Sequence, residues 1–245
     1  IDGLCSVPYL TNESIFTLTE APEHLIVVGG GPIGCEMAQA HRRLGSRVTL
    51  LELLTIMPKD DPDMVAVVRD RLIGDGVALR EGAKVEGVAA RSGGVRVIVD
   101  GAFVDGSHIL VATGRAPSVD GLGLEEAGVV YSPRGIDVDA RLRTSNKSIF
   151  ALGDVTGGFQ FTHQASYHAG IAIQNLLFRL PAKVDDSSIS WVTYTEPELA
   201  HVGVTAAQLM DADPKGTVLE SEFSGNDRAR AVREPDGRIK IMVDG

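Results

Sequence analysis

The decisive stretch of this sequence is HLIVVGGGPIG, residues 24–34. Its first half is a short apolar run that three glycines close, which is typical of a central strand in a parallel sheet. Good helix formers then occupy residues 33–44, with Gly45 as a stop. A second apolar run follows at residues 47–52. The sequence therefore predicts a β-α-β unit over residues 24–52, with a right-handed crossover.

Three of the glycines, Gly29, Gly31 and Gly34, match the pattern G-x-G-x-x-G. The pattern gains weight here because it follows a predicted strand and opens a predicted helix. Gly29 would permit the tight turn, Gly31 would let a pyrophosphate approach the backbone, and Gly34 would let helix and strand pack closely. The start of a helix also carries unpaired N–H groups and about half a positive charge. We therefore expect a dinucleotide at this turn.

An acidic residue, Glu52, follows Gly34 by 18 residues, at the end of the second predicted strand. A carboxylate in this place can accept hydrogen bonds from the hydroxyls of the adenine ribose, and it would repel a 2′-phosphate. Glu52 thus favours NAD(H) over NADP(H). NADP(H) remains open because four basic residues could lie near enough to tolerate a phosphate: Arg42, Arg43, Arg47 and Lys59.

The pattern after residue 52 predicts further helices and strands that extend the β-α-β unit to an α/β domain. A helix is expected with Asp61 as its cap and Gly74 beyond its end. The expected elements are the helix at 62–73, strands at 77–80, 84–90, 95–100 and 108–112, and a further pairing segment at 102–104. This order predicts a Rossmann-like parallel sheet with an antiparallel meander attached.

The second half of the chain has a different pattern. Residues 115–147 are rich in glycine and proline and predict loops, whereas 149–152 predict a buried strand that Gly153 and Asp154 end. Asp154 could hold a sugar hydroxyl or simply form a turn. A domain boundary is expected near 181–187, where the pattern changes again. The other expected elements are helices at 163–179 and 206–210 and strands at 188–194, 217–223 and 238–243.

Composition narrows the possible classes of protein. The 245 residues carry a formal net charge of −10, which argues against a partner as negatively charged as nucleic acid. No apolar run approaches the roughly 18 residues of a membrane helix, and these residues show no basic-then-apolar leader, so we expect a cytoplasmic protein. The spacing of Cys5 and Cys35 matches neither a metal site nor a redox pair. His163 and His168 are five residues apart, which does not suit a metal site on a helix.

Four motifs occur in an order that resembles the pyridine nucleotide–disulfide oxidoreductases, the group of glutathione reductase, dihydrolipoamide dehydrogenase and mercuric reductase. The motifs are GGGPIGCE at 29–36, ATGRAP at 112–117, ALGDV at 151–155 and YTEPE at 194–198. Residues 36–46 are most similar to the dihydrolipoamide dehydrogenase and mercuric reductase members. The resemblance covers essentially the whole chain. It implies an enzyme that binds FAD and NAD and passes hydride from NADH to FAD, then to a disulfide, a dihydrolipoamide-type thiol pair or a metal ion.

The resemblance also implies a domain order. Residues 1–20 would end a first FAD segment, 21–115 would bind NAD(P), and 116–185 would form a second FAD segment. Residues 186–245 would begin an α+β dimerisation domain, truncated here, so a homodimer is expected. Compared with the family pattern, the chain would be an internal part of a longer polypeptide. The cysteine pair and the catalytic His–Glu pair of that polypeptide would lie outside these 245 residues. We would then expect these 245 residues alone to be inactive.

Individual roles follow from the resemblance, position by position. The pyrophosphate of NAD would be bound by Gly29, Gly30, Gly31, Pro32, Ile33 and Gly34, its ribose by Glu52, and its adenine side would meet the backbone of Val85. Gly114 would line the nicotinamide side. Asp154 would hold FAD, and the backbone of Thr162 and His163 would face the flavin pyrimidine. Glu36 resembles the acid that supports the flavin, and no metal ligand is expected.

Two other functions fit the same residues. The first is a flavoprotein that binds both dinucleotides but uses no redox disulfide, such as a transhydrogenase or a quinone reductase. The second is a module that binds NADH without catalysis.

Overall fold

The structure is a computed structural model that describes residues 1–158, 160–185, 187 and 189–245. The chain divides into two compact units. The larger unit contains Ile1–Gly114, Val192–Leu199 and Thr205–Gly245, and the smaller unit contains Arg115–Trp191 and Ala200–Val204. Each unit is described by itself.

The larger unit is built on a parallel sheet of four strands in the order β3-β2-β1-β7. The strands are β1 (His24–Val28), β2 (Arg47–Leu51), β3 (Ala78–Arg80) and β7 (His108–Val111). All three pairings are parallel, and Leu25 of β1 lies between Val48 and His108 in the register. This is the strand order of half a Rossmann sheet, so the predicted fold class is confirmed.

Two helices connect these strands. Helix α1 (Pro32–Arg43) begins directly after the glycines, and α2 (Pro62–Gly74) begins after Asp61. The Asp61 carboxylate caps α2 by accepting a hydrogen bond from the backbone N–H of Asp63 at 3.2 Å, as the sequence predicts. Gly74 is the last residue of the helix and does not lie beyond its end.

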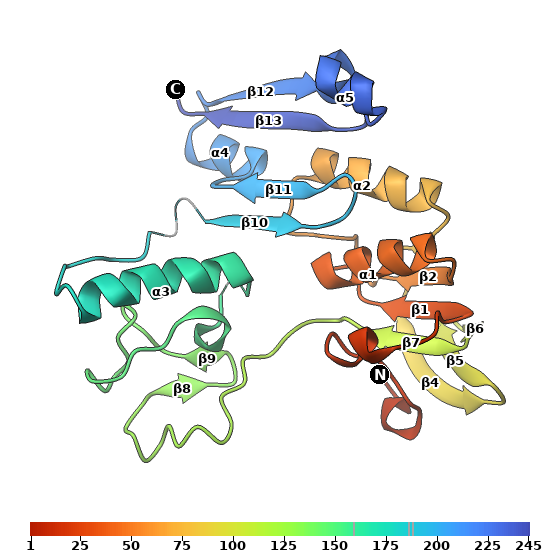
Figure 1. Ribbon diagram of the computed structural model, residues 1–245, viewed down its shortest axis with the longest axis horizontal. Helices are drawn as coiled ribbons and strands as arrows, with labels where there is room; N and C mark the ends of the chain where they lie inside the picture. Colours follow the sequence, from red (N-terminus) through yellow and green to blue (C-terminus); the bar gives the residue numbers. More distant parts are fainter. Residues whose placement is uncertain (159, 186, 188) are drawn as a thin grey trace. The chain divides into compact units, whose positions relative to one another are not determined.

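The central strand β1 is fully buried because both faces of the sheet are covered. Leu25 and Val27 pack with α1 and α2 in one cluster, and Ile26 and Val28 pack with the meander strands in another. Figure 1 shows this arrangement, with the two helices and the meander on opposite sides of β1. A strand buried on both faces needs a continuous apolar run, which explains the sequence of residues 24–28.

The meander is an antiparallel sheet in the order β4-β5-β6. Its strands are β4 (Val85–Arg91), β5 (Gly94–Val99) and β6 (Ala102–Gly106). Residues 1–20 form two short 3₁₀ turns, at Leu4–Ser6 and Ser14–Thr17. The predicted hairpin is therefore present, with a third strand longer than expected.

The C-terminal part contains two small sheets and two short helices. The elements are β10 (Ser190–Thr193), β11 (Leu199–Val202), α4 (Ala206–Ala212), β12 (Thr217–Glu222), α5 (Asp227–Val232) and β13 (Arg238–Val243). β10 pairs with β11, and β12 pairs antiparallel with β13. The sequence analysis did not anticipate β11 or α5. Of the strand expected at 188–194, residue 188 lies outside the described residues, as does residue 186 at the expected domain boundary.

The smaller unit contains one long helix, α3 (Thr162–Leu176), and a short hairpin of β8 (Tyr131–Ser132) and β9 (Gly135–Ile136). The helix ends three residues earlier than predicted. Arg179 then adopts a left-handed backbone conformation with φ +55°, which an α-helix does not allow. Among the described residues, no helix is both long and apolar enough to cross a membrane.

The prediction of a buried strand at 149–152 is wrong. The segment forms a single antiparallel bridge, between Phe150 and Arg143, and a 3₁₀ turn follows at Gly153–Thr156. Leu152 is exposed, and in the described part of the chain no parallel strand lies beside the segment. An apolar run becomes a central strand only where neighbouring strands supply its hydrogen bonds.

Candidate dinucleotide-binding site

The glycine turn between β1 and α1 is closed by backbone contacts that exclude side chains at two positions. A Cβ at Gly34 would lie 1.8 Å from the carbonyl oxygen of Gly29. Gly29 has φ +109°, and a Cβ there would lie 2.4 Å from the carbonyl oxygen of Ala112. Both distances are far shorter than a van der Waals contact. The tight turn and the close helix packing therefore require glycine at both positions.

Gly31 differs from these two glycines because it faces open space. A Cβ at Gly31 would meet no heavy atom within 4 Å, and its φ of −71° suits any residue. Gly31 is the N-cap of α1, and no side chain caps the helix there. Pro32 and Ile33 form the first two helical positions. The start of this helix is therefore open on the Cβ side of Gly31, which fits the approach of an anionic group such as a pyrophosphate.

Gly30 is held on both of its backbone groups. Its N–H donates to Glu52 Oε2 at 2.6 Å, and its carbonyl oxygen accepts from the N–H of Met57 at 2.9 Å and from Cys35 Sγ at 3.3 Å. A Cβ at Gly30 would lie 2.7 Å from Cγ2 of Ile56. The sequence does not predict these contacts, because no local motif marks Ile56 or Met57 and the glycine pattern assigns Glu52 to the ribose.

Glu52 lies directly after β2, at the carboxyl edge of the sheet, as predicted. Its Oε1 accepts from the N–H of Leu54 at 2.9 Å, and its Oε2 accepts from Gly30. A carboxylate offers about four lone-pair sites, so acceptor capacity remains for ribose hydroxyls. Glu52 therefore fits both a structural role in the turn and the ribose role.

Two further predicted residues lie on segments that adjoin the turn. Val85 begins β4, two residues after Ala83, whose N–H donates to the backbone carbonyl of Glu52 at 2.8 Å. Gly114 follows Ala112, whose N–H donates to the carbonyl of Val28 at 2.8 Å. The fold thus brings segments from four places in the sequence to one edge of the sheet.

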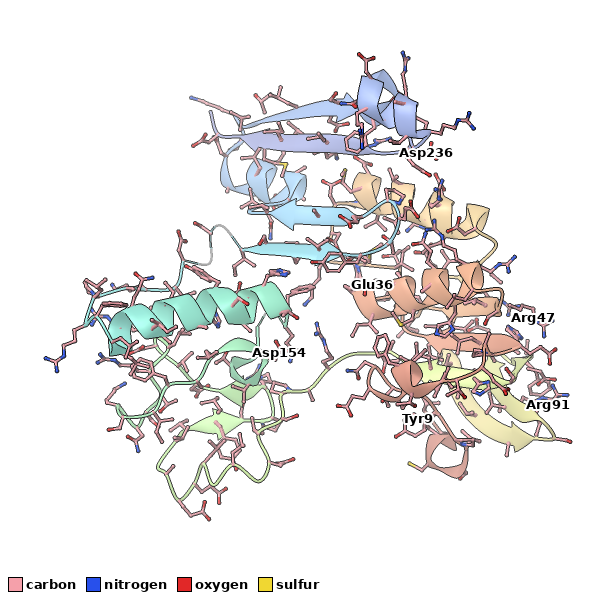
Figure 2. All side chains as sticks on the ribbon, in the orientation of Figure 1. Tyr9, Glu36, Arg47, Arg91, Asp154 and Asp236 are labelled. Atoms are coloured by element: carbon pink, nitrogen blue, oxygen red, sulfur yellow. The ribbon has the colours of Figure 1, made fainter. Side chains whose placement is uncertain are left out.

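Three of the four basic residues considered for a 2′-phosphate lie away from this edge. Arg47 begins β2, five residues before Glu52, and a strand rises about 3.3 Å per residue. Figure 2 shows Arg47 at the opposite end of α1 from Glu36. Arg42 and Arg43 end α1, about 15 Å along the helix from its start, and Arg43 pairs with Asp75 at 2.8 Å. Lys59, on the loop after Glu52, is the exception.

Glu36 lies on the first turns of α1 and is partly buried. Its Oε1 accepts from the N–H of Tyr194 at 2.8 Å, in the motif YTEPE. One turn further along the helix, Gln39 accepts from the N–H of Glu196 at 2.7 Å and donates to its carbonyl at 2.9 Å. These contacts attach the motif at 194–198 to α1 within the larger unit.

The predicted FAD residues gather in the smaller unit. Asp154, in the 3₁₀ turn, is about half exposed and lies 3.9 Å from Arg115, whose guanidinium is 5.8 Å from the centre of the Phe161 ring. Phe161 precedes α3, so Thr162 and His163 stand at the start of that helix. Figure 2 shows Asp154 near the start of α3. The structure thus brings these residues together, and it adds Phe161, which the sequence analysis did not consider.

The two cysteines have different environments, and both are free. Cys5 is exposed, whereas Cys35 is fully buried, and burial raises the pKa of its thiol to about 12. Cys35 is therefore not a reactive thiolate near neutral pH. Within the described ranges, no group of three or more His, Cys, Asp or Glu side chains is placed to hold a metal ion.

Comparison with known proteins agrees with this geometry. Residues 2–169 match the pyridine nucleotide-disulphide oxidoreductase family, and residues 189–245 match the dimerisation domain of that family. The chain belongs to the pyridine nucleotide-disulphide oxidoreductases.

Several characterised relatives cover nearly all of the chain. It is 34% identical to the dihydrolipoyl dehydrogenase of Bacillus subtilis over 96% of its length, and 34% identical to the mercuric reductase of Streptomyces lividans over 100%. Among solved structures, the HOCl-induced flavoprotein disulfide reductase RclA from Escherichia coli, in its Cu(II) complex, is 31% identical with a TM-score of 0.92. The chain covers 52% of the length of each of the two relatives and 58% of the length of RclA. The RclA structure matches 100% of the chain.

Proposed function

We propose that the protein is an FAD-dependent oxidoreductase that takes hydride from NADH and passes the two electrons through FAD to a disulfide, which becomes a dihydrolipoamide-type thiol pair, or to a metal ion. The observation that carries the proposal is the contrast within the glycine turn. Gly29 and Gly34 leave no room for a Cβ, whereas Gly31 opens to free space at the start of α1. This is the arrangement that a pyrophosphate needs.

The larger unit would bind and orient NADH. The backbone of Gly30–Gly34 and the start of α1 would hold the pyrophosphate, Glu52 would accept from the ribose hydroxyls, and Val85 would flank the adenine. Gly114 would lie on the nicotinamide side, where its lack of a side chain leaves space. Because a carboxylate repels a phosphate, Glu52 would make NADH the preferred substrate.

The smaller unit would bind part of FAD. Asp154 would accept hydrogen bonds from the cofactor, and the first backbone N–H groups of α3 at Thr162 and His163 would face the flavin. Both groups are at or near the surface, since Asp154 and Thr162 are exposed. A helix start stabilises negative charge that develops nearby. When bound, the nicotinamide and the flavin supply the hydride-transfer chemistry, while the protein supplies position and electrostatics.

Glu36 would support the flavin side of the site, in line with the family motif. Its bond to the N–H of Tyr194 uses one carboxylate oxygen and keeps the side chain in a defined position. A homodimer is proposed from the match of residues 189–245 to the family's dimerisation domain. A cytoplasmic location is proposed because both cysteines are free, as is usual in a reducing compartment.

NADH binding and acceptor use test this proposal. Calorimetric titration should show NADH binding more tightly than NADPH, and the absence of NADH binding would contradict the proposal. Because the 245 residues alone are expected to be inactive, the acceptors are compared in the full-length gene product. Its steady-state assays with lipoamide, Hg²⁺ and a quinone then separate the possible reactions. Turnover with the quinone alone would favour the quinone reductase alternative, and NADH binding without any turnover would favour a binding module.

The FAD contact is tested by Asp154→Ala, with Asp120→Ala as a matched exposed control in the same unit. The measured quantity is the flavin absorbance per chain of the purified full-length gene product, because these 245 residues alone are expected to hold FAD poorly. We expect Asp154→Ala to lower the occupancy and Asp120→Ala to leave it unchanged. Equal occupancy in both variants would show that Asp154 is only a turn residue.

A further inference from the structure

The loop after Glu52 contacts the glycine turn through two neighbouring residues, Ile56 and Met57. The N–H of Met57 donates to the carbonyl oxygen of Gly30 at 2.9 Å, and Cγ2 of Ile56 lies 2.7 Å from the position that a Cβ of Gly30 would take. Both residues are 1% exposed. The Ile56–Met57 segment therefore sets the position of the Gly30 peptide.

Met57 adopts a backbone conformation that must be stabilised by its surroundings. Its φ is +45°, in the left-handed region that residues other than glycine rarely occupy. Such a conformation is strained and persists only where neighbouring contacts enforce it. The burial of Met57 supplies some of these contacts, and the N–H of the preceding residue, Ile56, supplies another.

The N–H of Ile56 is held by an ion pair outside the glycine turn. The N–H of Ile56 donates to Glu81 Oε1 at 2.8 Å. Arg69, on α2, makes a two-pronged contact with the same carboxylate, through Nε at 2.8 Å and Nη2 at 2.9 Å. The two side chains are 27% and 24% exposed, and the guanidinium holds the pKa of Glu81 below its usual range. A two-pronged pair fixes the direction of the carboxylate as well as its charge.

We propose that the Arg69–Glu81 pair is a positioning pair for the dinucleotide site, acting through Ile56 and Met57 on the Gly30 peptide. The inference rests on the proposed function, because it gives the pair a role in binding NADH. Neither residue belongs to the glycine turn. Their contribution is to keep the backbone of the turn in the geometry that the pyrophosphate requires.

The experiment measures the Kd of NADH by calorimetry for three variants, with a matched control. Glu81→Leu removes the acceptor of the Ile56 N–H and should weaken NADH binding about tenfold, or about 1.4 kcal/mol. Glu81→Gln keeps an oxygen that can accept this bond and should restore most of the affinity. Arg69→Met leaves the carboxylate in place but unoriented, and should weaken binding about threefold.

The control is Arg96→Met, because Arg96 makes an equivalent two-pronged pair with Asp105 on the meander, at 2.7 and 2.8 Å. It should lower the Tm about as much as Arg69→Met and leave the Kd of NADH unchanged. Rescue by Glu81→Gln separates a positioning role from a general loss of stability.

The possible results are distinct. Unchanged NADH affinity in Glu81→Leu and Arg69→Met overturns the inference alone. Equal weakening in Arg96→Met also overturns it, since the effect would then follow stability. If Glu81→Leu does not fold, the NADH affinities of Arg69→Met and Glu81→Gln are compared instead. The inference then requires Arg69→Met to bind NADH more weakly than Glu81→Gln. An unmodified protein that binds no NADH overturns the proposed function, and this inference with it.

Discussion

Replacement of Gly31 by alanine should separate cofactor binding from stability. Gly31 is the one glycine of the G-x-G-x-x-G pattern at which an added Cβ meets no heavy atom within 4 Å, and its φ of −71° is ordinary for alanine. Alanine is a poorer N-cap than glycine, but it also reduces the entropy of the unfolded chain by about 0.4–1 kcal/mol. These effects oppose each other. We therefore expect a net change in the free energy of unfolding of less than about 1 kcal/mol, and a Tm within about 4 °C of the unmodified protein.

The effect on NADH should be much larger. If the pyrophosphate contacts the backbone at Gly31, a methyl group there must displace it or strain the turn. Overpacking of this kind costs about 1–3 kcal/mol, which corresponds to an affinity loss of about 5-fold to 150-fold. The structure therefore predicts a variant with nearly unchanged stability and a large defect in NADH binding.

The matched control is Gly34→Ala, whose Cβ would lie 1.8 Å from the carbonyl oxygen of Gly29. This variant should lose at least about 3 kcal/mol of stability, because the helix must move away from the strand. Thermal unfolding and calorimetric titration of both variants provide the test. Unchanged NADH affinity in Gly31→Ala would refute the placement of the pyrophosphate. A large drop in the Tm of this variant would show that the turn has no room for a side chain at residue 31.

Three further predictions address single residues. Glu52→Arg should shift the ratio of the NADH and NADPH affinities at least tenfold toward NADPH, although both affinities should fall because Gly30 loses its acceptor. A ratio that stays the same in calorimetric titrations would contradict this role. In the native protein at pH 8, a thiol reagent should label the exposed Cys5 quickly, whereas Cys35 should react only after denaturation, because burial excludes the reagent and raises the pKa of the thiol to about 12. Rapid labelling of both thiols would show that the environment of Cys35 is wrong. Lys240→Met should lower the free energy of unfolding by about 2 kcal/mol in urea titrations, because it leaves the buried Asp61 carboxylate without its partner at 2.9 Å. A loss below about 0.5 kcal/mol would mean that solvent already screens this pair.

Much of the larger unit could be predicted from local patterns. The apolar run at 24–28, the glycines that follow it and the alternation in the meander all act over a few residues, so the sequence displays them directly. The buried strand expected at 149–152 shows the limit of this reasoning. Its apolar residues are suitable for a strand, but strand formation depends on neighbours that residues 149–152 do not specify.

The residues of the candidate site likewise divide into those that the sequence predicts and those that it does not. Gly29, Gly34 and Glu52 could be identified because fixed spacings place them at one end of a β-α-β unit. The contacts that hold Gly30 in position could not be identified in advance. Met57 and Ile56 reach the turn through an irregular loop, and Glu81 reaches that loop from beyond β3, so no periodicity connects these residues in the sequence.

The sequence by itself determined the fold class, the place of the glycine turn and the acid at the edge of the sheet. These features depend on backbone geometry and on the alternation of apolar residues, which repeat over short distances along the chain. The folded chain was needed to show that Glu52 also accepts from the Gly30 N–H and that Arg42, Arg43 and Arg47 lie away from Glu52. It also shows that Glu81, paired with Arg69, accepts from the N–H of Ile56. Hydrogen bonds and ion pairs are effective over only a few ångströms, so contacts between residues 12 to 25 positions apart exist only after the chain has folded around its core.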